Sequence, residues 1–72
     1  MKEYTVIYEN GPNNWSAYVP DLPGCIATGK TREEIGKRIQ EAIEFHIEGL
    51  RLHGESIPEP SIEADKVAVS SA

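Results

Sequence analysis

The sequence predicts an α+β protein of two layers, in which one helix packs on a mainly antiparallel sheet with the element order βββαβ. Three observations lead to this fold class: several short stretches alternate between apolar and polar residues, one longer stretch has apolar residues at helical spacing, and turn-forming residues separate them. The chain has 72 residues, 39% hydrophobic and 26% charged. A chain of this length builds one core, so we expect residues 1–72 to form a single soluble domain.

The first half of the chain has the pattern of three strands. Residues 2–9 alternate, with Tyr4, Val6 and Tyr8 on one side, which is typical of a strand. Residues 10–14 are turn formers and the alternation resumes over residues 15–19, which predicts an antiparallel hairpin. Two prolines and a glycine within residues 20–24 end the second strand, and residues 25–28 fit a short third strand.

A single helix is predicted to begin at Thr31, because Thr31 and Glu34 have the spacing of a capping box. At about 100° per residue, the apolar residues that follow fall in one stripe, and the charged residues lie mostly on the other side. The stripe consists of Ile35, Ile39, Ala42, Ile43, His46, Ile47 and Leu50. We therefore expect one face of the helix to pack on the sheet.

The predicted helix ends at His53 and Gly54, because glycine favours the C-terminal cap of a helix and the prolines that follow prevent its continuation. Residues 66–69 again have a strand pattern, with Val67 and Val69 on one face. One helix covers only one face of a sheet. The other face is therefore expected to meet water, a symmetry mate or another protein.

The charge of the chain favours a basic partner. Seven lysines and arginines against twelve aspartates and glutamates give a net charge of −5, which disfavours direct binding to a phosphate backbone. Cys25 is the only cysteine, so an internal disulfide is impossible, and we expect a cytoplasmic protein. No apolar run approaches the roughly 20 residues of a membrane span, and no signal peptide is expected before the first strand.

Two motifs of this chain resemble a known family. Residues 20–25 (PDLPGC), residues 29–34 (GKTREE) and the amphipathic helix that follows resemble the HicB-like antitoxins over nearly the whole chain. The resemblance implies a partial RNase H-like βββαβ fold, homodimers or higher homo-oligomers, no cofactor, and binding to a HicA toxin. A HicA toxin is a small basic ribonuclease that cleaves mRNA, and the antitoxin works by covering its active site.

The chain differs from the family pattern at two points. Longer relatives carry a C-terminal DNA-binding segment that represses the toxin operon, whereas this chain stops at Ala72, so we expect no direct DNA binding. Gly36 stands where family members often have alanine, at a cost of about 1 kcal/mol in helix stability.

Seven residues are candidates for contact with a partner. In the proline-rich loop, Leu22 is expected to project outwards from a rigid backbone, although a tight connector explains the loop equally well. Phe45 and Leu52 are apolar on a helix face that should be wet; we expect a partner to cover Phe45 and the connector 57–62 to cover Leu52. The glutamates nearby suit a basic toxin, although a solvated face is the plainer interpretation. The candidate set is Asp21, Leu22, Pro23, Glu41, Glu44, Phe45 and Glu48.

A degenerate RNase H-like, metal-dependent nuclease is the main alternative. Glu3 and Glu9 are six residues apart, about 20 Å along a strand, which is too far to share two metal ions about 4 Å apart. His46 and His53 are seven residues apart, beyond the reach of a helical metal pair, and Cys25 fits a packed small hydrophobe better than a reactive thiol. We therefore predict that the chain is not an enzyme. An oligomeric interaction domain without a toxin is a third possibility.

Overall fold

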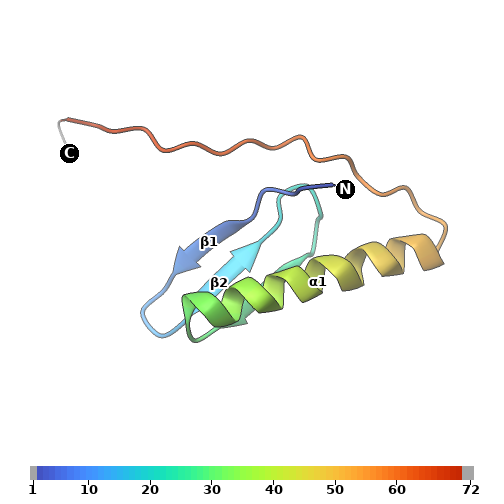
Figure 1. Ribbon diagram of the computed structural model, residues 1–72, viewed down its shortest axis with the longest axis horizontal. Helices are drawn as coiled ribbons and strands as arrows, with labels where there is room; N and C mark the ends of the chain where they lie inside the picture. The colour runs from blue at the N-terminus through green and yellow to red at the C-terminus, as the bar shows by residue number, and fades with distance from the viewer. Residues whose placement is uncertain (1, 71–72) are drawn as a thin grey trace.

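Three short strands and one long helix form the regular structure of the protein. The computed structural model describes residues 2–70. Strands β1 (Ile7–Asn10), β2 (Trp15–Tyr18) and β3 (Ile26–Gly29) form an antiparallel sheet in the order β1-β2-β3, and helix α1 (Arg32–Leu52) packs on one face of it (Figure 1). The predicted α+β class with two layers is confirmed, in the order βββα. The further likeness to RNase H stays a prediction.

The strand register separates the side chains onto two faces of the sheet. Ile7 is paired with Tyr18, and Tyr18 with Ile26; directly paired residues share a face. Tyr18 and Ile26 are exposed, whereas Ala17, one residue along β2, is fully buried under α1. Ile7, Tyr18 and Ile26 therefore lie together on the face that the helix leaves open, as the single-helix architecture predicts.

The core is small and lies between α1 and the sheet. It consists of Ala17, Val19, Leu22, Cys25, Ile35 and Ile39. A helix of 21 residues is about 32 Å long, whereas a four-residue strand covers only about 13 Å. The sheet therefore ends under the middle of α1. This explains why Ile35 and Ile39 of the predicted stripe are buried, while Ile47 and Leu50 further along are only partly buried.

Two strands begin later than the alternation predicts. The N–H of Val19 donates to the carbonyl of Cys25 at 3.1 Å, and Pro20 has no N–H to donate, so β2 ends at Tyr18. Residues 2–6 then find no partner strand in the described part of the chain, so the strand predicted over residues 2–9 is confirmed over residues 7–9 and wrong over residues 2–6. The N–H of Cys25 closes a turn onto the carbonyl of Leu22 at 3.0 Å. As a result β3 begins at Ile26.

Helix α1 begins at the predicted cap. Thr31 is the N-cap, and its hydroxyl accepts a hydrogen bond from the N–H of Glu34 at 3.0 Å. The Glu34 carboxylate accepts from the N–H of Lys30 at 2.7 Å, so the return bond of the predicted capping box reaches one residue further back. Gly29 is buried beside this turn, and a Cβ there would lie 3.1 Å from the nitrogen of Ile35. Glycine thus allows the end of β3 to approach the first turn of α1.

The other end of α1 is closed by a glycine, as predicted. Gly54 has a φ of 68°, a left-handed conformation that glycine adopts without strain. The N–H of Gly54 donates to the carbonyl of Arg51 and that of Glu55 to the carbonyl of Leu50. These two bonds are those of a Schellman motif. Within residues 2–70, no helix is both long and apolar enough to span a bilayer.

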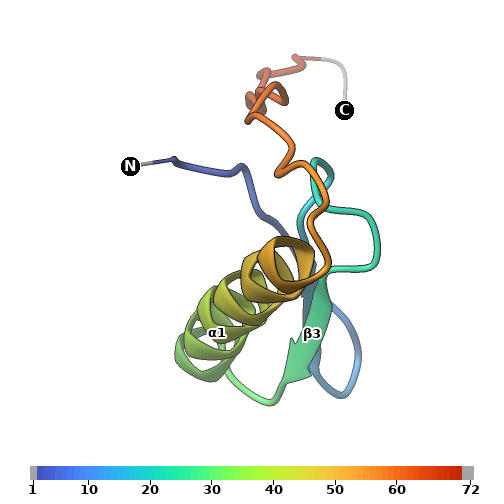
Figure 2. The same cartoon turned by 90° about the vertical axis from the view of Figure 1, so that its right-hand side faces the viewer.

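Residues 55–70 contain no helix or strand, so the strand predicted over residues 66–69 does not form in this structure. The segment first crosses the end of the sheet, where the Tyr4 hydroxyl donates to the carbonyl of Pro58 and the Thr5 hydroxyl to that of Ile62, both at 2.6 Å. It then runs away from the sheet (Figures 1 and 2). The alternation alone is insufficient, because a strand needs a neighbouring ladder of hydrogen bonds.

Candidate partner-binding surface

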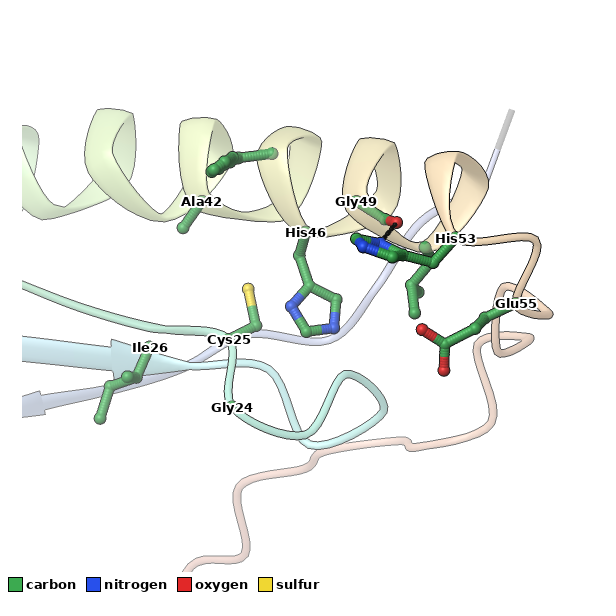
Figure 3. A pocket seen from close by; sticks show the side chains of 10 residues that line it. Gly24, Cys25, Ile26, Ala42, His46, Gly49, His53 and Glu55 are labelled. Carbon is green, nitrogen blue, oxygen red and sulfur yellow. Dashed lines mark hydrogen bonds between the residues drawn. The ribbon is translucent and has the colours of Figure 1, made fainter.

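An open groove lies between the second half of α1 and the start of β3. Its volume is about 430 Å³, and its lining includes Cys25, Ile26, Phe45, His46 and Gly49. Figure 3 shows the Cys25 thiol and the His46 ring pointing into the same space from the loop and from the helix. The groove exists because α1 extends beyond the sheet, so this part of the helix has no strand beneath it.

Phe45 forms an exposed apolar edge of the groove. Its side chain is 72% exposed, which agrees with the apolar position expected on a wet helix face. One turn further on, a Cβ added to Gly49 would meet no atom within 4 Å, so a partner has room to approach the helix there. Leu52 is also exposed, at 76%. The expectation that the connector covers Leu52 is wrong, because residues 58–62 are bound to Tyr4 and Thr5 instead.

The proline-rich loop is a tight connector, and Leu22 does not project outwards. Its side chain is completely buried, which corrects the expected outward orientation. The cause is the backbone of the loop: the N–H of Leu22 donates to the carbonyl of Val19 at 3.0 Å, and the carbonyl of Leu22 accepts from Cys25. Gly24, with a φ of 86°, completes the turn. Pro23 remains exposed and is the candidate residue of the loop that a partner can touch.

A second hollow of about 380 Å³ lies on the other side of the loop. It shares Gly24, Cys25 and Ile26 with the groove and continues to Tyr18 and Pro23. An apolar strip, defined here as Phe45, Ile26, Tyr18 and Pro23, therefore runs from the helix to the open face of the sheet. The candidate set missed Tyr18 and Ile26. The signal in the sequence was the alternation of side chains along a strand: if Ala17 and Val19 face the helix, Tyr18 between them faces the other side of the sheet.

Asp21 is bound within the molecule. Its carboxylate accepts hydrogen bonds from the N–H of Ser61 at 3.0 Å, from the Ser61 hydroxyl at 2.8 Å and from the N–H of Ile62 at 3.1 Å. The N–H of Ser61, followed by its hydroxyl, holds the pKa of Asp21 below the usual 3.8, since hydrogen bonds to a carboxylate favour its charged form. The structure thus gives Asp21 the role of an anchor for the C-terminal segment.

The three candidate glutamates of α1 are exposed and are neighbours on the helix surface, but they differ in how close they lie to Phe45. Glu41 and Glu48 are four residues before and three after Phe45, the spacings at which side chains are neighbours on a helix surface. Glu44 instead lines a separate hollow beside Lys2 and Arg51. Glu41 and Glu48 therefore flank the exposed aromatic ring, and Glu44 does not.

Cys25 and His53, whose side chains could in principle act as nucleophile or metal ligand, are engaged in the packing and capping of the fold. Cys25 is a free, buried thiol, and burial raises its pKa; the predicted packing as a small hydrophobe is confirmed. Nδ1 of His53, the C-cap of α1, lies 2.8 Å from the carbonyl of Gly49 and donates to it in the matching tautomer. Across residues 2–70, no three histidine, cysteine or acidic side chains are placed to hold a metal ion.

Comparison with known proteins identifies the family. Residues 4–70 match the family described as the HicB_like antitoxin of bacterial toxin-antitoxin systems. The chain belongs to the HicB-like antitoxin family. This confirms the resemblance found in the two sequence motifs.

Individual proteins of other organisms are similar to this chain over most of its length. A UPF0150 protein of Thermoplasma acidophilum is 40% identical over 63 residues, which cover 88% of this chain and 91% of the relative. A 14.9 kDa protein of the rep-hol intergenic region of Haemophilus phage HP1 is 38% identical over 55 residues, which cover 76% of this chain but only 41% of the phage protein.

A solved structure shows the same fold in a toxin-antitoxin context. A chain in the HicA3 and HicB3 toxin-antitoxin complex superposes with a TM-score of 0.71 and 32% sequence identity, over 83% of this chain and 70% of that chain. The similarity covers most of this chain, at a level of identity that exceeds a likeness of fold alone. It supports an antitoxin role for the HicB-like chain.

Proposed function

We propose that this HicB-like protein is an antitoxin that binds a small basic toxin of the HicA type and blocks its RNA-cleaving site by covering it. The observation that carries the proposal is the 32% identity, over 83% of the chain, to a chain of the HicA3 and HicB3 complex. Occlusion requires a complementary surface and no chemistry. The protein therefore acts without a cofactor and is not itself an enzyme.

The surface that suits this role is the apolar strip together with Glu41 and Glu48. Exposed apolar area centred on an aromatic ring is typical of the energetic centre of a protein interface. Carboxylates at the edge attract a basic partner, in keeping with the net charge of −5. Of the remaining candidates, Pro23 fits this surface by its exposure, whereas Leu22 is buried in the core and Asp21 is engaged with the C-terminal segment.

The decisive experiment combines the protein with the small basic protein encoded by the neighbouring open reading frame. We expect the two to co-purify, and we expect RNA cleavage by the basic protein to stop when this chain is added in equal amount. The chain alone, incubated with labelled RNA and Mg²⁺ or Mn²⁺, should leave the RNA intact. Cleavage by the chain alone would favour the nuclease alternative, and a failure to bind would contradict the antitoxin role.

Phe45→Ala locates the toxin-binding surface. Because Phe45 is 72% exposed, its truncation should leave the folded chain intact, whereas loss of an interface anchor should weaken toxin binding at least about tenfold. Leu52→Ala is the matched control, since Leu52 is equally exposed on the same helix but does not line the groove. Equal weakening by both variants would show that the interface is not centred on the groove.

Two further features belong to the proposal. A toxin-antitoxin pair that acts on mRNA places this protein in the cytoplasm, where the toxin has its substrate. The homo-oligomer implied by the family is also proposed for this chain, with the homodimer as its simplest form. The negative charge gives no support to direct DNA binding.

A further inference from the structure

The C-terminal segment has a strand pattern but no strand partner. Residues 63–70, defined here as the arm, leave the sheet after Ile62, and all of them are exposed. Val67 and Val69, on one side of the alternation, are 80% and 64% exposed. Exposed valines in an alternating segment are typical of a strand that pairs with a partner outside its own chain.

The root of the arm is firmly held. The segment before it is bound by the hydroxyls of Tyr4 and Thr5, by the Asp21 carboxylate, and by an ion pair of 2.9 Å between Lys2 and Glu59. These contacts set where the arm leaves the body, which Figure 1 shows as an extension far beyond the strands. The radius of gyration is 14.1 Å, against about 11 Å for a compact chain of this length.

The sheet has one edge ready to receive a strand. At the β3 edge, the Arg38 guanidinium of α1 donates to the carbonyl of Thr28 at 3.2 Å, so part of that edge is already occupied. β1 is the opposite edge, and in the described chain its outer side carries no comparable side-chain cap. An open edge strand is a template for pairing with another chain.

We propose that the arm of one copy adds as a strand to the β1 edge of a second copy, and that the second copy returns its own arm, forming a strand-exchanged homodimer. The arm spans about 26 Å when extended and β1 about 13 Å, so the reach is sufficient. Both halves of the interface, an unpaired strand and an unpaired edge, belong to this same chain, which is the requirement for exchange between identical copies. The inference does not rest on the toxin.

The exchange gives the valines a place in a core. Val6 and Tyr8 are only partly buried against the core, and the Arg32 guanidinium lies 3.5 Å from the centroid of the Tyr8 ring. In the exchanged dimer, Val67 and Val69 of the added strand point toward the helix side and cover Val6 and Tyr8. Ala68 and Ser70 then face outwards. The βββαβ order that the sequence predicts is then completed between two chains instead of within one.

The first test compares two variants of equal charge. V67D/V69D places two carboxylates on the side that enters the partner, whereas A68D/S70D places two on the outward side of the same arm. We expect the unaltered chain and A68D/S70D to sediment at twice the chain mass at roughly tens of micromolar, and V67D/V69D to dissociate at least about 100-fold more readily. A monomeric unaltered chain, or equal behaviour of the two variants, would overturn the proposal. Circular dichroism checks that each variant keeps its helix.

The second test distinguishes exchange from pairing of the arm with its own β1. A chain carrying Glu9→Cys on β1 and Ala68→Cys on the arm, in a Cys25→Ala background, is treated with a short bifunctional maleimide. Strand exchange predicts covalent dimers on a denaturing gel. A covalent monomer would show that the arm folds back onto its own sheet, and would refute the exchange even if the antitoxin function is correct.

Discussion

Asp21 is the residue whose chemistry gives the clearest dependence on pH. Hydrogen bonds from Ser61, then Ile62, hold its pKa below 3.8. A carboxyl with a lower pKa in the folded state stabilises that state above its unfolded pKa, and the contribution is lost as the pH falls through the folded pKa. We expect the backbone amide proton shifts of Ser61 and Ile62 to titrate together, with a midpoint below 3.8, as the C-terminal segment is released. Nuclear magnetic resonance between about pH 5 and pH 1 checks this.

Asp21→Asn and Asp65→Asn form a matched pair for this prediction. Both remove one negative charge, but among residues 2–70 the Asp65 carboxylate accepts only from the N–H of its neighbour Lys66. We expect Asp21→Asn to abolish the common titration of the two amides and Asp65→Asn to leave it in place. If Asp65→Asn removes the titration as well, the segment responds to net charge and not to the Asp21 anchor.

Leu22 shows how far a side chain can depart from its expected place. The prolines around it suggested a rigid, outward-pointing loop, but the turn bonds from Val19 to Cys25 direct the side chain into the core. Leu22→Ala should therefore lower the free energy of unfolding by about 2–5 kcal/mol. The exposed Leu52→Ala should change it by no more than about 0.5 kcal/mol. Urea unfolding measures both, and equal losses would contradict the burial of Leu22.

One glycine inside helix α1 and one just after its C-cap predict opposite effects of the same substitution. A Cβ at Gly49 meets no atom within 4 Å, so Gly49→Ala should raise the free energy of unfolding by about 1 kcal/mol through helix propensity. Gly54 has a φ of 68°, where a side chain is strained, so Gly54→Ala should lower it by about 1 kcal/mol. Urea unfolding of the two variants checks the signs, and a shared sign would disprove this account of the helix end.

The elements differ in how well their boundaries follow from the sequence. The start of α1 was predictable because Thr31 and Glu34 act on backbone groups within the same turn. The strand boundaries were not, because they depend on which residues the neighbouring strand can still pair, and β2 ends at Tyr18. The strand predicted over residues 66–69 is absent for the same reason. These residues alternate as a strand does, but no strand within residues 2–70 of the same chain forms hydrogen bonds with them in this structure.

The pattern of the helix and strands predicts only part of the candidate surface. Phe45 stood out because helical periodicity places it away from the apolar stripe, and it is indeed exposed. Tyr18 and Ile26 can be recognised as parts of one surface only once the strand register is known, because the register pairs them across β2 and β3. Glu41 and Glu44 look alike in the sequence, yet only Glu44 lines the hollow that also contains Lys2 and Arg51.

For the whole molecule, the net charge of −5 acts mainly on the rate at which a basic toxin is captured. Charges at the edge of an interface steer encounter, whereas buried apolar anchors determine how slowly the complex dissociates. If the proposed surface is correct, Glu41→Gln should slow association with the toxin several-fold at low salt and leave dissociation unchanged. Phe45→Ala should do the reverse.

Glu44→Gln separates a local effect from the effect of total charge. It removes the same charge from the same helix, but from a position that lines the hollow with Lys2 and Arg51. We expect it to slow association less than Glu41→Gln, and the difference to vanish as added salt shortens the screening length to roughly 3 Å at 1 M. Stopped-flow mixing with the toxin over a range of salt concentrations measures both rates. Equal slowing by the two variants would mean that the molecule attracts its partner by net charge alone, and the surface around Phe45 would lose its electrostatic support.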